Sequence, residues 1–117
     1  MGDLSPNFSR SEFECKCCGK MILDTEFLAR LQSLRDQWQM PMIITSGYRC
    51  PEHNKAVGGS PHSQHLEGRA ADIAMTSGTE RWEFLRLCYQ HGFTGIGIHS
   101  KYIHLDTRFA NKVLFLY

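Results

Sequence analysis

Apolar side chains recur with helical spacing in two long segments of the chain. The first helix is predicted to begin at Asp24 or Thr25, either of which can cap a helix, and to run to about Gln37. A second helix is predicted after Ser77 or Thr79. Apolar residues three and four positions apart give the first helix one apolar face: Phe27, Leu28, Leu31, Leu34 and Trp38. Both helices are therefore expected to bury one side against a core.

Shorter apolar runs predict the strands of a small sheet. Four runs have the length and composition of strands: 42–45, 70–75, 93–99 and 102–107. The last two flank a turn at Ser100-Lys101 and predict a hairpin, and the apolar tail Val113–Tyr117 predicts an edge strand. A short helix over Pro51–Ala56 and a polar loop over Ser60–Gly68 separate the first two strands. Two main helices with about four strands indicate an α+β fold.

A length of 117 residues fits one domain, over residues 1–117, with residues 1–20 as an N-terminal arm. The net charge of +1 gives no field that would attract nucleic acid, so none is expected as a partner. No apolar run approaches the length of about 18–20 residues that spans a bilayer, which argues against membrane insertion. The first residues lack the regions of a signal peptide. We therefore expect a monomer that stays in the cytoplasm unless another factor releases it.

Five cysteines raise the possibility of a structural metal site. Cys15, Cys17 and Cys18 lie together in the arm, and with Cys50 they could bind a structural metal ion. Their spacing differs from the paired CxxC motifs of zinc ribbons. Free or partly buried thiols, or a cysteine pair that oxidises outside the cell, are the alternatives. Cys88 lies in an apolar helical stretch and is expected in the core.

Two histidines and an aspartate predict a metal centre. The segment 63–72, SQHLEGRAAD, contains His65 and Asp72, and a later predicted strand contains His104. Two imidazoles and a carboxylate suit zinc, and three protein ligands leave a fourth position for water, as in catalytic zinc sites. Side chains alternate along a strand, so Asp106 should point the same way as His104 and lie beside the metal.

This pattern resembles the M15-type zinc peptidases, the superfamily of D-alanyl-D-alanine carboxypeptidases and phage endolysins. Its signature is Ser-x-His-x-x-Gly-x-Ala-x-Asp with a second His on a later strand, and every position is met. Further segments resemble the small branch of the family: Ile44–Asn54, Val57–Gly59, Gly95–Gly97 and Tyr102–Arg108. The resemblance runs from about Phe8 to Arg108. It implies a small antiparallel sheet that carries a zinc site and is flanked by the two main helices, as in hedgehog and DD-peptidase folds.

The resemblance also implies roles for single residues. His65, Asp72 and His104 are expected to bind one catalytic zinc ion. Arg49 is expected to contact substrate and to steady charge at the scissile carbonyl, with a structural ion pair to Glu52 or Asp106 as the alternative. In many relatives an acid three residues before the second His serves as general base. Lys101 stands at that position here and cannot play that part while protonated.

Three further residues are candidates for the chemistry. Asp106 is the acid nearest to His104 and is the expected general base. Alternatively, Asp106 orients a ligand histidine or binds Arg108. His99 is a candidate to contact substrate as an acid or base or by stabilising the transition state, and Ser63 is a candidate to bind substrate or a ligand side chain. An ordinary packed, hydrogen-bonded histidine is the alternative for His99.

Together these features imply a zinc metallopeptidase that hydrolyses peptidoglycan stem peptides with metal-activated water, as a D,D-carboxypeptidase or an endopeptidase. Family members split a terminal D-Ala-D-Ala, a cross-link involving D-alanine, or the L-Ala-D-Glu bond, and the sequence does not select among them. A phage or prophage lysin that reaches the cell wall after release fits these expectations. The alternative is a catalytically inactive, zinc-stabilised binding module or virion structural component, because Lys101 replaces the usual acid.

Overall fold

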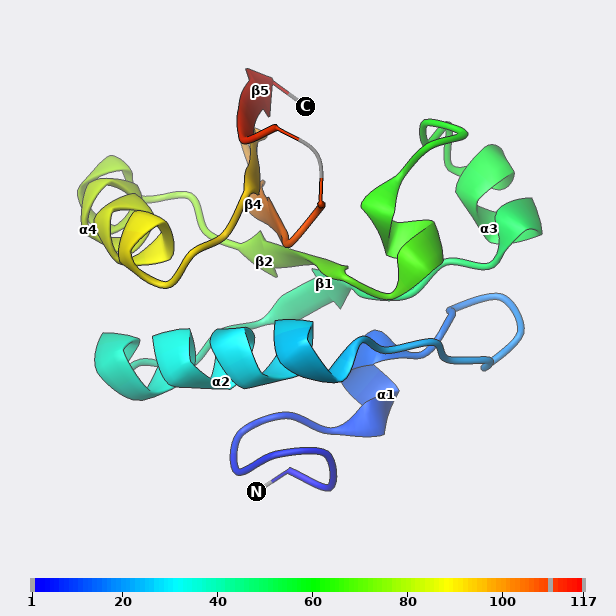
Figure 1. Ribbon diagram of the computed structural model, residues 1–117, viewed down its shortest axis with the longest axis horizontal. Helices are drawn as coiled ribbons and strands as arrows, with labels where there is room; N and C mark the ends of the chain where they lie inside the picture. The colour runs from blue at the N-terminus through cyan, green and yellow to red at the C-terminus, as the bar shows by residue number, and fades with distance from the viewer. Residues whose placement is uncertain (1, 110, 117) are drawn as a thin grey trace.

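A five-stranded sheet forms the centre of the computed structural model, which describes residues 2–109 and 111–116. Its strands lie in the order β1-β2-β4-β3-β5 (Figure 1). The fold is a small α+β fold, as predicted, and the described residues form four α-helices, of which α1 was not predicted. The elements follow one another along the chain as α1 (Arg10–Phe13), α2 (Thr25–Trp38), β1 (Ile44–Ser46), α3 (Pro51–Ala56), the 3₁₀ helix η1 (Gln64–Glu67), β2 (Ala70–Ala74), α4 (Gly78–Gln90), β3 (Gly95–Ile98), β4 (Tyr102–Asp106) and β5 (Val113–Leu116).

The two main helices begin at residues that the sequence indicated as caps. The side chain of Asp24 accepts the backbone N–H of Phe27, and that of Ser77 accepts the N–H of Glu80. Each bond satisfies a backbone donor that has no partner within the first turn of its helix. The predicted boundaries of both helices are therefore close to the observed ones, because capping depends only on neighbours along the chain.

The two faces of the sheet differ in polarity because side chains alternate along each strand. One face joins α2, α4 and the N-terminal arm in a single apolar core, whose buried residues include Phe8, Phe13, Phe27, Leu31, Leu34, Ile73, Phe84, Cys88, Ile96, Ile103 and Leu105. Phe8 and Phe13 join the arm to this core, and Cys88 is buried as expected. Asp72, His104 and Asp106 occupy the alternate positions of β2 and β4 and point away from this core.

The register of the central strands brings the polar positions together. Strand β2 pairs with β4 so that Asp72 lies opposite His104 and Ala70 lies opposite Asp106. On its other side β4 pairs with β3, where Gly95 lies opposite Asp106 and Gly97 opposite His104. The polar side chains of β4 therefore lie between a strand with a carboxylate and a strand with glycines.

The sheet is mixed, whereas a fully antiparallel sheet was predicted. Strand β5 pairs with β3 in parallel, and Val113 lies beside Gly95. The reason is the antiparallel pairing of β3 and β4, which places the end of β4 next to the start of β3. A short connection from there starts β5 beside Gly95, and β5 then runs in the direction of β3. The predicted edge strand is present as β5, and Tyr117 lies outside the described residues.

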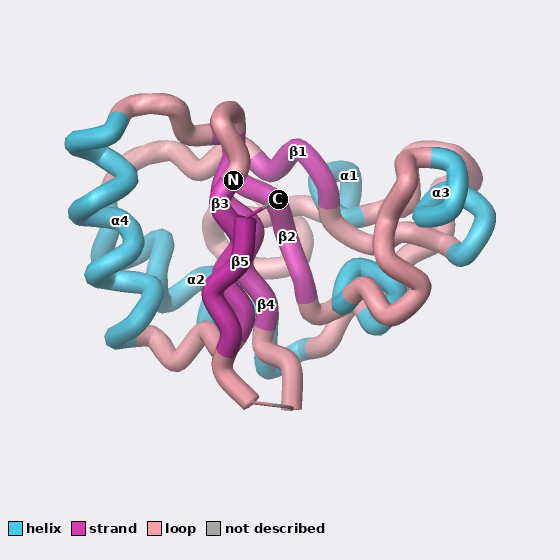
Figure 2. The backbone as a smooth tube through the Cα atoms, turned by 90° about the horizontal axis from the view of Figure 1, so that it is seen from above, coloured by secondary structure: helices cyan, strands magenta, loops and turns pink. Residues whose placement is uncertain are grey.

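Helices α3 and α4 lie on opposite sides of the sheet, as both views show (Figures 1 and 2). Helix α4 belongs to the apolar core, while α3 and η1 lie toward the side where the polar positions gather. Among the residues that the structure describes, no helix is both long enough and apolar enough to cross a bilayer.

Candidate metal centre

The fold brings His65, Asp72 and His104 into one buried group. His65 comes from η1, and the other two come from the middle of neighbouring strands β2 and β4. Their exposed fractions are 0%, 2% and 3%. One ligand atom from each lies within 4.8 Å of the others, which makes the three residues a candidate metal site. The set is the one that the sequence predicted.

Ser63 and Gly68 shape the loop that presents His65. The Ser63 hydroxyl accepts the backbone N–H of His65 at 3.2 Å and so caps the 3₁₀ helix. Gly68 ends this helix with a φ of 70°, a conformation that favours glycine. A Cβ there would also collide with the carbonyl of Ile22. The serine and glycine of the motif therefore fix the backbone around the ligand.

The spacing of the donor atoms fits a tetrahedral metal ion. Oδ1 of Asp72 lies 3.3 Å from Nε2 of His65 and 3.1 Å from Nδ1 of His104. Zinc binds nitrogen and carboxylate oxygen at about 2.0–2.2 Å, so its ligands in a tetrahedron lie about 3.3–3.5 Å apart. The residues present therefore fit a zinc ion without rearrangement of the backbone.

Hydrogen bonds orient both imidazole rings toward Asp72. Nδ1 of His65 lies 2.7 Å from the carbonyl oxygen of Gly47. Nε2 of His104 lies 2.7 Å from Oδ2 of Asp106. Both partners are acceptors, so each of these nitrogens carries a proton, and the opposite nitrogen of each ring faces the candidate site. Partners of this kind set the tautomer and orientation of metal-binding histidines.

The pKa values of the group follow from burial and close pairing. Burial lowers the pKa of His65, which favours the neutral imidazole that binds metals. Burial alone would raise the pKa of the Asp72 carboxyl, but its close pairing with His104 and His65 lowers it to about 2. Burial would lower the pKa of His104, but Asp106 and Asp72 raise it. The two carboxylates therefore favour the protonated form of His104 more than solvent does.

Asp106 is fully buried beneath His104, and both of its oxygens are engaged. Besides the bond to His104, Oδ1 accepts Nε–H of Arg108 at 2.9 Å and Oδ2 accepts Nη2–H of the same guanidinium at 2.6 Å. The backbone N–H of Arg108 also donates to Oδ1 at 3.1 Å. Burial would raise the pKa of Asp106, but the bonds from His104 and Arg108 hold it well below its usual range.

Gly95 provides the space for the Asp106 carboxylate. A Cβ on Gly95 would collide with both carboxylate oxygens, which His104 and Arg108 hold in place. We expect Gly95→Ala to displace Asp106 and to weaken zinc binding about 10- to 100-fold, the usual effect of losing a partner of a ligand. Competition with a zinc chelator measures the change. Gly78→Ala is the control, because a Cβ on Gly78 meets nothing within 4 Å. Equal affinity in both variants would contradict this role of Gly95.

Arg49 lies against the other side of Asp72. It is 8% exposed, and its Nη2 lies 3.4 Å from Oδ2 of Asp72. Its Nε donates to Ser46 Oγ at 3.2 Å, and its Nη1 donates to Oδ1 of the buried Asn54 at 3.3 Å. A Cβ on Gly59 would collide with that Asn54 oxygen. The guanidinium is thus held by three side chains, in an ion pair with Asp72 rather than with Glu52 or Asp106.

A pocket of about 260 Å³ opens onto the candidate metal site. Its walls come from the segment before α3, the loop between α3 and η1, β4 and β5, and the lining residues are Arg49, Gly58, Gly59, Ser60, Ser63, His104, Phe115 and Leu116. Arg49 and Ser63, both predicted to contact substrate, therefore line the same space as the ligand His104. Phe115 also packs on the His104 ring, with centroids 5.3 Å apart.

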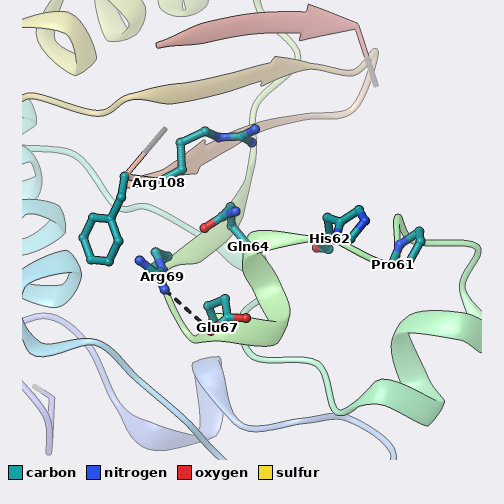
Figure 3. A pocket seen from close by; sticks show the side chains of 8 residues that line it. Pro61, His62, Gln64, Glu67, Arg69 and Arg108 are labelled. Carbon is teal, nitrogen blue, oxygen red and sulfur yellow. Dashed lines mark ion pairs between the residues drawn. The ribbon is translucent and has the colours of Figure 1, made fainter. Parts of the chain in front are cut away.

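A second pocket of about 420 Å³ lies beside the first and shares Ser63 with it. Figure 3 shows Arg69 and Arg108 at one end and His62 and Pro61 at the other. Arg69 pairs with the exposed Glu67 at 3.5 Å. Two guanidinium groups therefore border this second pocket, which we call the groove, next to the candidate metal site.

His99 lies at the turn between β3 and β4, outside the linings of both pockets. Its ring stacks on Tyr102 with centroids 4.2 Å apart, and its Nδ1 accepts the backbone N–H of Lys101 at 3.0 Å. Lys101 itself is exposed at the same turn. The structure therefore separates His99 from the space that Arg49 and Ser63 share.

Sequence reasoning missed four contributions to the site: the Gly47 carbonyl, Asn54, Gly95 and Phe115. The Gly47 carbonyl and the Phe115 ring act through contacts between distant segments and leave no local pattern, and Asn54 acts through a bond to Arg49 that no sequence motif indicated. Gly95 did carry a signal, because a glycine in a predicted strand indicates close approach by another group.

The comparison with protein families gives one result for this chain. A model of the family described as Peptidase M15 matches residues 6–106, which include all three candidate ligands as well as Arg49 and Asp106. No curated protein sequence matches the chain. Because the family match covers most of the sequence, the chain belongs to the peptidase M15 family.

Proposed function

We propose that this protein is a zinc-dependent peptidase that hydrolyses peptide bonds in the stem peptides of bacterial peptidoglycan. One observation carries the proposal: a ligand set suited to zinc borders a pocket that also holds a buried arginine, in a chain of the M15 family. Hydrolase chemistry follows from the family, and the stem-peptide substrate follows from what the family acts on.

Nε2 of His65, Oδ1 of Asp72 and Nδ1 of His104 would hold the zinc ion. When bound, zinc acts as a Lewis acid and lowers the pKa of water toward neutrality. The protein holds the three donors in place through the Gly47 carbonyl and the Asp106 carboxylate before any metal arrives. Such pre-arrangement reduces the cost of ordering the site on metal binding.

Arg49 is suited to bind the carbonyl oxygen of the scissile bond. It lines the pocket together with His104, and Ser46, Asn54 and Asp72 hold its guanidinium in place. A fixed positive group that faces a developing negative oxygen lowers the barrier of hydrolysis without reorganisation. Ser63 borders the same pocket and is suited to hydrogen-bond the substrate backbone.

Arg49→Lys tests this role. Lysine keeps the charge but lacks the planar fork that satisfies three partners at once, so kcat/KM should fall about 10²- to 10³-fold while the zinc content stays unchanged. Steady-state kinetics and metal analysis on the same sample measure both quantities. Arg86→Lys on the exposed surface of α4 is the control. A wild-type kcat/KM in Arg49→Lys would remove this arginine from the mechanism.

Of the two roles that the sequence left open for Asp106, its contacts support the orienting role. The carboxylate is fully buried, and His104 and Arg108 occupy both oxygens, so it is poorly placed to accept a further proton from solvent or substrate. We propose that Asp106 fixes the ring of His104 and supports its binding to zinc. In this role Asp106 is a positioning residue.

The groove with Arg69 and Arg108 suggests how a stem peptide is held. The positive charge of guanidinium groups attracts carboxylates, and stem peptides carry free carboxylates. The groove adjoins the pocket of Arg49 and His104 through Ser63, so a bound peptide could span both. We propose that this groove binds the acidic portion of the substrate.

The deciding experiment is mass spectrometry of purified peptidoglycan fragments after incubation with zinc-loaded protein. A chelator-treated sample and the His65→Ala variant are the controls. Zinc-dependent products support the peptidase, and their masses distinguish loss of terminal D-alanine from opening of a cross-link or cleavage after L-alanine. Intact fragments from several wall types would contradict it and favour a zinc-bearing binding module, which the exposed Lys101 at the usual position of the acid also favours.

A further inference from the structure

Four cysteine side chains from two distant segments meet beside α3. Three come from the turn after α1 and one precedes α3, and we call this group the thiol cluster: Cys15, Cys17, Cys18 and Cys50. One Sγ from each lies within 4.8 Å of the others. We propose that the thiol cluster binds a second zinc ion, in a structural tetrathiolate site separate from the histidine site.

The distances between the sulfur atoms support a single shared ion. Sγ of Cys17 lies 3.6 Å from Sγ of Cys15 and 3.3 Å from Sγ of Cys50. Zinc binds thiolate sulfur at about 2.3 Å, so the sulfurs of a tetrahedral site lie about 3.8 Å apart. A small outward movement of Cys17 would therefore complete the tetrahedron. Four sulfur ligands in this geometry select zinc or iron among the common metals.

The backbone around the thiol cluster is already arranged for charged sulfur ligands. The N–H of Cys50 donates to Sγ of Cys15 at 3.4 Å, and the N–H of His53 donates to Sγ of Cys50 at 3.4 Å. Bonds of this kind stabilise thiolates and hold ligands in orientation. Between these ligands, a tight turn is closed by the N–H of Gly19 on the carbonyl of Cys15 at 2.8 Å. Gly19 has a φ of 73°, as such a turn requires.

A disulfide explains the thiol cluster less well than a metal ion does. A disulfide joins two sulfurs at about 2.0 Å, and it would not account for the two further thiols that lie beside it. Cys15 and Cys50 are buried, whereas Cys17 and Cys18 are exposed, so an ion can enter from solvent and be closed in from the protein side. The geometry, with four sulfurs around one point, matches an ion and not a pair of bonds.

The thiol cluster would join the N-terminal arm to residues 47–50, which contact the histidine site through Gly47 and Arg49. Cys50 directly follows Arg49 and caps α3, and the N–H of Tyr48 donates to the carbonyl of Phe13 at 2.8 Å. The same segment supplies the Gly47 carbonyl that orients His65. A second ion would therefore hold the Gly47 carbonyl and Arg49 in place beside the histidine site. Such an effect of the second ion on catalysis rests on the proposed function.

Metal analysis of freshly purified, reduced protein tests the proposal. We expect two zinc ions per chain in the wild type, one in Cys17→Ser, one in His65→Ala and two in the control Cys88→Ala, whose thiol lies in the core. Cys18→Ser replaces Cys17→Ser should the latter fail to fold. After replacement of zinc by Co²⁺, sulfur-to-metal charge-transfer bands should persist in His65→Ala and disappear in Cys17→Ser.

Three results would overturn the proposal. One zinc ion in the wild type without charge-transfer bands would leave the thiols without metal. Loss of two free thiols on purification under air, with no metal bound, would identify a disulfide. Iron in place of zinc would reject the assigned metal. None of these results depends on peptidase activity, so failure here is distinct from failure of the proposed function.

Discussion

His65→Ala should abolish zinc binding at the histidine site and reduce kcat/KM by about 10³-fold or more. The variant removes one of three buried donors, and Asp72 and His104 alone are too few for a stable site. The Lewis acid contributes several kcal/mol of transition-state stabilisation, which corresponds to a loss of at least this size. Because zinc stabilises only the folded chain, addition of zinc should also raise the Tm of the variant less than that of the wild type.

Equilibrium dialysis with zinc, hydrolysis of stem peptides and thermal unfolding on one preparation measure the three effects. His91→Ala is the matched control, because His91 lies at the end of α4 and bonds to Gln37, away from the site. It should keep the zinc content and activity of the wild type. A wild-type zinc content in His65→Ala would reject His65, Asp72 and His104 as the ligand set.

Asp106→Asn should abolish most hydrolysis and weaken zinc binding about 10- to 100-fold. The carboxamide keeps the size of the side chain, but it lacks the charge and one acceptor oxygen that serve His104 and Arg108. The half-buried guanidinium of Arg108 then loses its counter-ion, and the His104 ring loses the partner that sets its tautomer. Both changes act on the metal site before any substrate binds.

The zinc affinity of Asp106→Asn separates the two roles of this residue. An orienting partner changes the affinity, whereas a general base changes kcat and leaves the affinity as in the wild type. Chelator competition and kinetics at saturating zinc give both values. Asp36→Asn on the exposed side of α2 is the control. Full activity in Asp106→Asn would exclude both roles.

Local patterns in the sequence predicted the elements well. The caps at Asp24 and Ser77 and the apolar spacing along α2 involve neighbours within one or two turns, and such interactions do not depend on the rest of the fold. The motif likewise identified His65, Asp72 and His104, which the structure brings together. For His65 the motif is informative because Ser63 and Gly68 shape the loop that carries this ligand.

Only the tertiary structure decided the contacts between distant segments. Strand β5 runs parallel to β3 because the end of β4 lies beside the start of β3, and a predicted hairpin does not reveal where the next segment docks. The same holds for Arg49 on Asp72 and for Cys50 beside the thiols of the arm.

The sequence by itself thus determined α2, α3, α4, the strands and the set of candidate ligands, because periodicity, caps and motif spacing depend on short stretches of chain. The short helices α1 and η1 were not predicted. The tertiary structure decided the direction of β5, the partner of each ligand and the meeting of the four thiols. These depend on strand register and on packing of the arm against the sheet, which balance many weak contacts between residues far apart in the chain.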